Sequence, residues 1–182
     1  MQPIGPLMWE HRTIEQAVSV VAESLTRMRR TGVLERGLLE LSVDFIRMYA
    51  DRTHHGKEED ILFRALQDRP LSAEERTVVD ELMAEHVRAR QLTKQVVTGI
   101  ETHAAAGSGG TDMVLAALEQ LCLLYPAHIE KEDKRLFHQV MRHFTRDEMD
   151  RMLEEFREFD RQLIHERYAA RIDEMQRAAA GR

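Results

Sequence analysis

Hydrophobic residues recur along this chain at gaps of three and four, which is the period of an amphipathic α-helix with one buried face. Five segments with this period follow one another, and helix-breaking residues such as Gly32, Pro70 and the run at 107–110 separate them. The predicted helices cover about residues 7–31, 34–67, 72–106, 111–143 and 145–178. The pattern therefore predicts an all-α fold.

Polar side chains occupy some positions on the buried faces of these helices, in the stripes of hydrophobic residues where core residues are expected. Each of the first four predicted helices carries one such histidine, and the second and fourth helices also carry a glutamate four residues later. A histidine and a glutamate at i and i+4 lie on one face of a helix, one turn apart. The residues concerned are His11, His54, Glu58, His86, His128 and Glu132.

The two halves of the chain repeat one another around these positions. The segment 54–63 reads HHGKEEDILF and recurs in weaker form at 128–137 as HIEKEDKRLF, while LMWEH at 7–11 recurs as LMAEH at 82–86. Each half thus contains a histidine, a long spacer and then His-x-x-x-Glu. A duplicated helical hairpin alone would not explain why polar residues stay at core positions.

The spacing of the four histidines predicts that they meet at one level. The first turn lies about midway between His11 and His54, the second midway between His54 and His86, and the third near the middle of the span from His86 to His128. Antiparallel helices joined at these turns return to the same height, because each residue advances the helix by ~1.5 Å. We therefore predict an up-down-up-down four-helix bundle, followed by a fifth, C-terminal helix.

The residue types at this level indicate a metal site. Histidine nitrogen and carboxylate oxygen form a ligand set that suits iron, manganese or zinc. Two unpaired glutamates in a bundle core would be very costly unless a cation compensates their charge. Metal sites in helical bundles are formed by ligands that project inward from facing helices. The predicted ligands are His11, His54, Glu58, His86, His128 and Glu132.

Composition and charge exclude several other classes of protein. The net charge of −6, with both signs interspersed, argues against a nucleic-acid partner. No apolar run approaches the ~20 residues of a membrane helix, and no basic segment followed by an apolar run marks a secretion signal. The single Cys122 cannot form an internal disulfide, which suits a reducing compartment, so we expect a cytoplasmic protein.

These motifs resemble those of the hemerythrin-like family, the His-His-Glu cation-binding domains. The resemblance covers roughly residues 7–143 and includes the Lys-Glu-Glu-x-x-Leu-Phe motif that follows His54. It implies a bundle that holds two non-haem iron ions, bridged by Glu58 and Glu132 and by an oxo or hydroxo group. The histidines of the four helices would complete the coordination of the two irons.

The chain departs from the oxygen-carrying hemerythrins at one position. Those proteins have a fifth histidine one turn from the other on the third helix, where this chain has Leu82 and Arg90. With four histidines and two glutamates, the predicted site is more similar to the di-iron bundles of proteins that repair iron centres after nitrosative stress. Fewer protein ligands leave more coordination positions open to water or substrate.

Three functions remain open at this point. The first is the binding or sensing of dioxygen or nitric oxide. The second is an enzyme of oxidative or nitrosative stress defence, which consumes peroxide or nitric oxide or repairs iron centres with a redox partner. The third is a zinc-bound or metal-free structural bundle.

Other side chains lie close to the predicted ligands along the chain. The repeat aligns Ile129 with His55, so we prefer His54 as the ligand and interpret His55 as a supporting or solvent-facing residue that could add a ligand. Glu15, one turn along the first helix, is interpreted as a surface carboxylate that could add a ligand. The hydroxyl of Tyr125 could reach the metal pocket or lie at the rim of the bundle. The histidines outside this layer, expected to be solvated, are His103, His138, His143 and His165.

The fifth predicted helix has no counterpart in the repeat. We assign residues 1–143 to the bundle domain and residues 144–182 to a helical extension. The apolar stripe of the extension is too long to leave in water. We expect part of it to pack along its own bundle and the remainder to form a homodimer contact. The stripe consists of Met152, Phe156, Phe159, Leu163, Tyr168, Ile172 and Met175.

Overall fold

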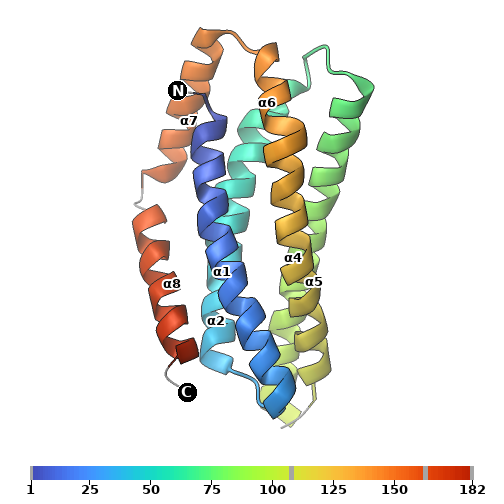
Figure 1. Cartoon of the computed structure of the whole chain (residues 1–182), viewed down its shortest axis with the longest axis vertical. Helices are drawn as coiled ribbons and strands as arrows, with labels where there is room; N and C mark the ends of the chain where they lie inside the picture. The colour runs from blue at the N-terminus through green and yellow to red at the C-terminus, as the bar shows by residue number, and fades with distance from the viewer. Residues whose placement is uncertain (1, 107–108, 162–163, 181–182) are drawn as a thin grey trace.

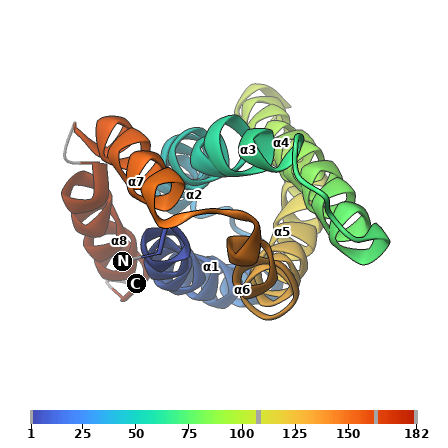
Figure 2. The same ribbon diagram turned by 90° about the horizontal axis from the view of Figure 1, so that it is seen from above.

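The computed structural model describes residues 2–106, 109–161 and 164–180, and every regular element in these ranges is a helix. Four antiparallel helical rods form a bundle, and two further helices stand along one side of it (Figure 1). Seen end on, the rods surround a common axis (Figure 2). The predicted all-α bundle is confirmed. None of the described helices combines the length and apolar character that a membrane span requires.

The rods follow the order of the chain. The first rod is α1 (Ile4–Thr31) and the third is α4 (Ala73–Ala106). The second rod is made of α2 (Arg36–Phe45), η1 (Ile46–His55), η2 (Glu58–Phe63) and α3 (Arg64–Leu66). The fourth is made of α5 (Thr111–Lys131), η3 (Glu132–Leu136), α6 (Phe137–Val140) and η4 (Met141–His143). The outer helices are α7 (Arg146–Asp160) and α8 (Ile164–Ala180).

Two turns between rods depend on glycine. Gly32 follows α1 with φ of 69°, and its N–H donates to the carbonyl oxygen of Met28 at 2.8 Å, which closes the helix. Gly110 precedes α5 with φ of 86°, and a Cβ there would lie 2.3 Å from the carbonyl oxygen of Gly99. A residue other than glycine would have a strained backbone at either position, because positive φ favours glycine.

The buried side chains of the bundle form two apolar clusters with a polar layer between them. The larger cluster contains residues such as Leu25, Leu39 and Leu118, and the smaller one contains residues such as Leu7 and Leu62. The polar layer holds the histidines and glutamates that the sequence placed at core positions, all at most 1 % exposed. Apolar packing on both sides therefore fixes the height of the polar layer in the bundle.

The second rod departs from a regular α-helix where it crosses the polar layer. The segments η1 and η2 are π-helical, with the wider turns that i→i+5 hydrogen bonds produce. His54 and His55 are both 1 % exposed there, so two successive side chains face the interior. The interpretation of His55 as solvent-facing is therefore wrong, because it assumed 3.6 residues per turn.

The predicted fifth helix is two helices in the described part of the chain. Helix α7 ends at Asp160, and Arg161 lies in a turn, whereas Leu163 lies outside the described residues. Both α7 and α8 contribute buried side chains to the two apolar clusters, so the extension packs along its own bundle, as expected for part of it. Phe159 is 39 % exposed, and the homodimer contact remains a prediction. The buried members of the stripe are Met152, Phe156, Tyr168, Ile172 and Met175.

Candidate metal centre

Buried histidine and carboxylate side chains gather in two adjoining groups within the polar layer, which we call centre A and centre B. Within each group the candidate ligand atoms all lie within 4.8 Å of one another. All four rods contribute to the two centres, and the structure thus brings all six sequence-predicted residues together. Centre A consists of His11, His54, Glu58 and Glu132, and centre B consists of His55, Glu58, His86 and His128.

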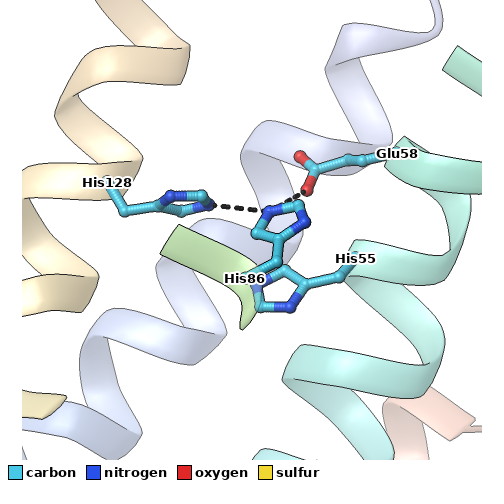
Figure 3. Close-up of side chains that lie close together, drawn as sticks. All are labelled: His55, Glu58, His86 and His128. Carbon is cyan, nitrogen blue, oxygen red and sulfur yellow. Dashed lines mark hydrogen bonds and ion pairs between the residues drawn. The ribbon is translucent and has the colours of Figure 1, made fainter. Parts of the chain in front are cut away.

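Each of the two glutamates reaches both centres. One carboxylate oxygen of Glu58 lies 3.4 Å from Nε2 of His54. The other lies 3.4 Å from Nε2 of His86, and Figure 3 shows this second contact. Glu132 places one oxygen 3.0 Å from Nε2 of His11 in centre A. Its other oxygen lies 3.3 Å from Nε2 of His128 in centre B. Both carboxylates are therefore placed to bridge two cations.

An outer carboxylate orients each of the four predicted histidines. A carboxylate only accepts, so Nδ1 must donate its proton to it, which leaves the Nε2 lone pair for the interior. Sequence reasoning did not identify these carboxylates, although an acidic residue precedes the first histidine of each half and follows each glutamate. The pairs are His11 with Asp133 at 2.8 Å, His54 with Glu10 at 2.8 Å, His86 with Glu59 at 2.7 Å and His128 with Glu85 at 2.8 Å.

The atoms that face the interior of the two centres fit bound metal ions. Among the described residues, the oxygens of Glu58 and Glu132 and Nε2 of His55 are buried and have no hydrogen-bond partner outside the histidines of the two centres. Such atoms are costly to bury unless a cation lies among them. The Nε2 atoms of His11 and His54 are 3.0 Å apart. Two ligands at right angles, each about 2.1 Å from one ion, would have about this separation.

His55 makes the two centres unequal. Its ring stacks on that of His86, with centroids 3.8 Å apart and 12° between the planes, and both rings lie beside Glu58 (Figure 3). Because the second oxygen of Glu132 also reaches His128, centre B gathers three histidines and two glutamates in all, whereas centre A gathers two of each. The repeat cannot reveal this difference, because the counterpart of His55 is Ile129, which packs in the apolar core.

Glu15 and Tyr125 lie near the centres but differ in their surroundings. Glu15 is 39 % exposed and accepts a hydrogen bond from Arg12, so its interpretation as a surface carboxylate holds. Tyr125 is only 1 % exposed, and its ring lies 6.3 Å from that of His55. Its hydroxyl has no hydrogen-bond partner among the described residues, and it is buried rather than at the rim.

The remaining histidines lie outside the two centres. His138 is exposed, as expected. His103 is half-buried and pairs with the hydroxyl of Thr111 at 3.1 Å. The expectation for His143 is wrong, since its side chain is 11 % exposed and lies 3.0 Å from a carboxylate oxygen of Glu75. The side chain of His165 lies outside the described residues.

Neighbouring carboxylates raise the pKa values of His11, His86 and His128. Burial lowers the pKa of His11, but hydrogen bonds to Asp133 and Glu132 outweigh it and raise the pKa to about 9. Burial also lowers the pKa of His128, but the charge of Glu132 and the hydrogen bonds of His128 to Glu132 and Glu85 outweigh it and raise the pKa to about 10. Burial and the neighbouring histidines lower the pKa of His55 well below its usual range. Without metal, protons on His11 and His128 balance the buried carboxylates.

This balance predicts how the stability of the metal-free protein depends on pH. A histidine whose pKa is raised by folding stabilises the native state fully below its unfolded pKa, near 6.5, and loses that contribution as the pH rises through its folded pKa. The free energy of unfolding should therefore fall between pH 6.5 and pH 10, which urea titrations would measure. Because metal replaces these protons, the loaded protein should change less over that range. Equal pH dependence with and without metal would contradict the assignment.

Comparison with known protein families agrees with this geometry. The hemerythrin family, described as the hemerythrin HHE cation binding domain, matches residues 3–140 of the chain. No curated protein and no solved structure shows a significant match. The matched range contains both histidine–glutamate motifs, all seven residues of the two centres and the four outer carboxylates. The chain therefore belongs to the hemerythrin HHE cation-binding domain family.

Proposed function

We propose that centres A and B hold a pair of non-haem iron ions that reversibly binds dioxygen or nitric oxide. The observation that carries the proposal is the bridging position of Glu58 and Glu132, because each gives one oxygen to each centre. Centre B offers five donors, which is more than the four that zinc usually takes in a structural site. The mixture of imidazole nitrogen and carboxylate oxygen suits iron.

The difference between the centres favours centre A as the place where the small ligand binds. Reduced iron supplies the electrons and the open coordination position that dioxygen and nitric oxide require. Centre A has four protein donors and centre B has five, so centre A leaves more positions open. The ring of Phe137, which belongs to the smaller apolar cluster, stacks against that of His11 with centroids 5.6 Å apart and forms an apolar wall on this side. Such a wall excludes water from a ligand that carries little charge.

A cleft on the surface offers this small ligand a route toward the buried centres. It has a volume of about 250 Å³ and lies between η1 and α4. Asp51, which is 3.4 Å from Nδ1 of His55, lines the cleft together with Arg90 and Tyr125. The buried Tyr125 hydroxyl is placed to donate a hydrogen bond to a molecule that enters there. We propose this cleft as the entrance, through which a ligand passes the His55 side of centre B before it reaches the open positions of centre A.

Rapid mixing of the iron-loaded, reduced protein with dioxygen or nitric oxide tests the proposal. We expect one ligand to bind per chain and to give a stable visible spectrum that reverses when the ligand is removed. A sealed electrode that records ligand consumption provides the second readout. The zinc-loaded protein is the matched control, because it keeps the charge of the site but cannot supply electrons.

Two results would contradict reversible binding. Continued consumption of dioxygen, nitric oxide or peroxide in the presence of a reductant would instead indicate an enzyme of stress defence. Failure of the protein to take up iron, together with tight binding of zinc, would indicate a structural site. A stable adduct with no further consumption supports the proposal over both.

A further inference from the structure

A fully buried lysine links centre A to helix α7. Lys57 has no exposed side-chain surface, and its ammonium group contacts Oε1 of Glu10. The same ammonium lies 2.6 Å from Oδ1 of Asp160. The other oxygen of Glu10 accepts the hydrogen bond from Nδ1 of His54 at 2.8 Å. Glu10, Lys57 and Asp160 therefore form a buried series of alternating charges, which runs from the imidazole of His54 to the last residue of α7.

The second half of the chain contains a matching series, but solvent reaches it. His128 donates to Glu85, whose other oxygen lies 2.7 Å from the ammonium of Lys131, and Glu81 completes the series at 2.8 Å. Lys131 is 17 % exposed and Glu81 is 45 % exposed. In the first half, Lys57 and Glu10 are 0 % exposed and Asp160 is 23 % exposed. The two series differ mainly in burial.

Helix α7 accounts for this difference. The ring of Phe156 covers the Lys57 ammonium at 5.8 Å, and Asp160 follows one turn later on the same helix. No equivalent helix covers Lys131 among the described residues, where Glu81 comes from α4 itself. Helix α7 lies beyond residues 3–140, the range that matches the family. The terminal carboxylate of the buried series is thus an addition outside the family domain.

We propose that Asp160 is a positioning residue that acts through Lys57 and Glu10 on His54, and thereby sets the reduction potential of iron in centre A. This inference rests on the proposed function, because it concerns the bound iron. Asp160 does not line the entrance cleft. Its effect is transmitted by the charge of the buried series and by the hydrogen bond that orients the imidazole.

The sign of the effect follows from the charges. With Asp160 present, two carboxylates share the single positive charge of Lys57, so Glu10 keeps more of its negative charge for His54. Without the charge of Asp160, Lys57 draws on Glu10 alone, and the imidazole becomes a poorer donor to iron. A poorer donor and one fewer negative charge nearby both favour the ferrous ion, and burial limits screening by water. The potential should therefore rise.

Spectroelectrochemical titration of the iron-loaded full-length protein and three variants tests the inference. Asp160→Asn keeps the size of the side chain but removes its charge, and Glu81→Gln makes the same change in the solvated series. We expect Asp160→Asn to raise the ferrous to ferric ratio at a fixed potential at least tenfold, which is about 59 mV for one electron. Glu81→Gln should change the ratio by a much smaller factor. Asp160→Glu should restore the wild-type potential.

Iron content and thermal melting are measured on the same samples, because a merely structural role would change them without changing the potential. An unshifted potential in iron-replete Asp160→Asn overturns the inference, and so do equal shifts in Asp160→Asn and Glu81→Gln. If Asp160→Asn loses iron, Asp160→Glu must recover both iron and potential, and failure to recover them also overturns it. A wild-type protein without iron would instead refute the proposed function, and the inference with it.

Discussion

Replacing Glu58 by alanine is expected to reduce the metal content from two ions per chain to fewer than one. One oxygen of Glu58 faces His54 in centre A and the other faces His86 in centre B, so a single change removes a donor from both centres. The ions also lose half of the carboxylate charge that offsets their repulsion. Metal analysis after loading and desalting measures the effect.

Glu59→Gln is the matched control for this variant. Glu59 is the next residue and accepts the hydrogen bond from Nδ1 of His86 at 2.7 Å, but it does not face the interior of either centre. Loss of an outer partner typically weakens metal affinity about 10- to 100-fold, so the control should still bind two ions when metal is in excess. If Glu58→Ala kept two tightly bound ions, the bridging assignment would be wrong. Circular dichroism of both metal-free variants checks that the bundle stays folded.

Removing the metal is expected to lower the melting temperature by about 10 °C or more. Metal that binds only the native state adds its binding free energy to folding, about 4 kcal/mol when free metal exceeds the dissociation constant a thousandfold. For a chain of this size, each kcal/mol shifts the melting temperature by about 2–4 °C. In the metal-free protein, only the protons on His11 and His128 offset the charges of the buried Glu58 and Glu132. Differential scanning calorimetry before and after chelation gives the shift.

The Glu58→Ala variant provides the control for this second experiment. Without paired metal, its melting temperature should change little on chelation. An unchanged melting temperature in the wild-type protein after verified metal removal would mean that metal bound at the two centres adds nothing to the free energy of unfolding. Recovery of the original melting curve on reloading would show that chelation did not damage the chain.

The sequence predicted the bundle and the level of its polar layer because both depend on local periodicity. Antiparallel helices joined by turns midway between the histidines bring them back to the same height. The spacing therefore predicts His11, His54, His86 and His128 in one layer, and the structure brings them together. His55 was misplaced for a physical reason. The wider turns of η1 and η2 let two successive residues face the interior, and helical periodicity assumes a constant turn.

The surroundings of the centres were predicted less well than the centres themselves. The outer carboxylates Glu10 and Glu85 precede histidines in both copies of the repeat, and that signal could have identified them. The contact of Asp160 with Lys57 left no such signal, because it joins residues far apart in the chain and the extension is not repeated. The break after Asp160 was missed because the apolar period of 145–178 continues through it.

Anaerobic titration of metal-free protein with ferrous iron, followed by oxidation and Mössbauer spectroscopy, determines whether the two centres hold a bridged iron pair. In the proposed site, Glu58 and Glu132 bridge two ions held by the histidines of centres A and B. We expect saturation at two irons per chain and a magnetically coupled ferric pair with no net spin. Saturation at one iron or fewer, or two ferric ions that show no coupling, would contradict it.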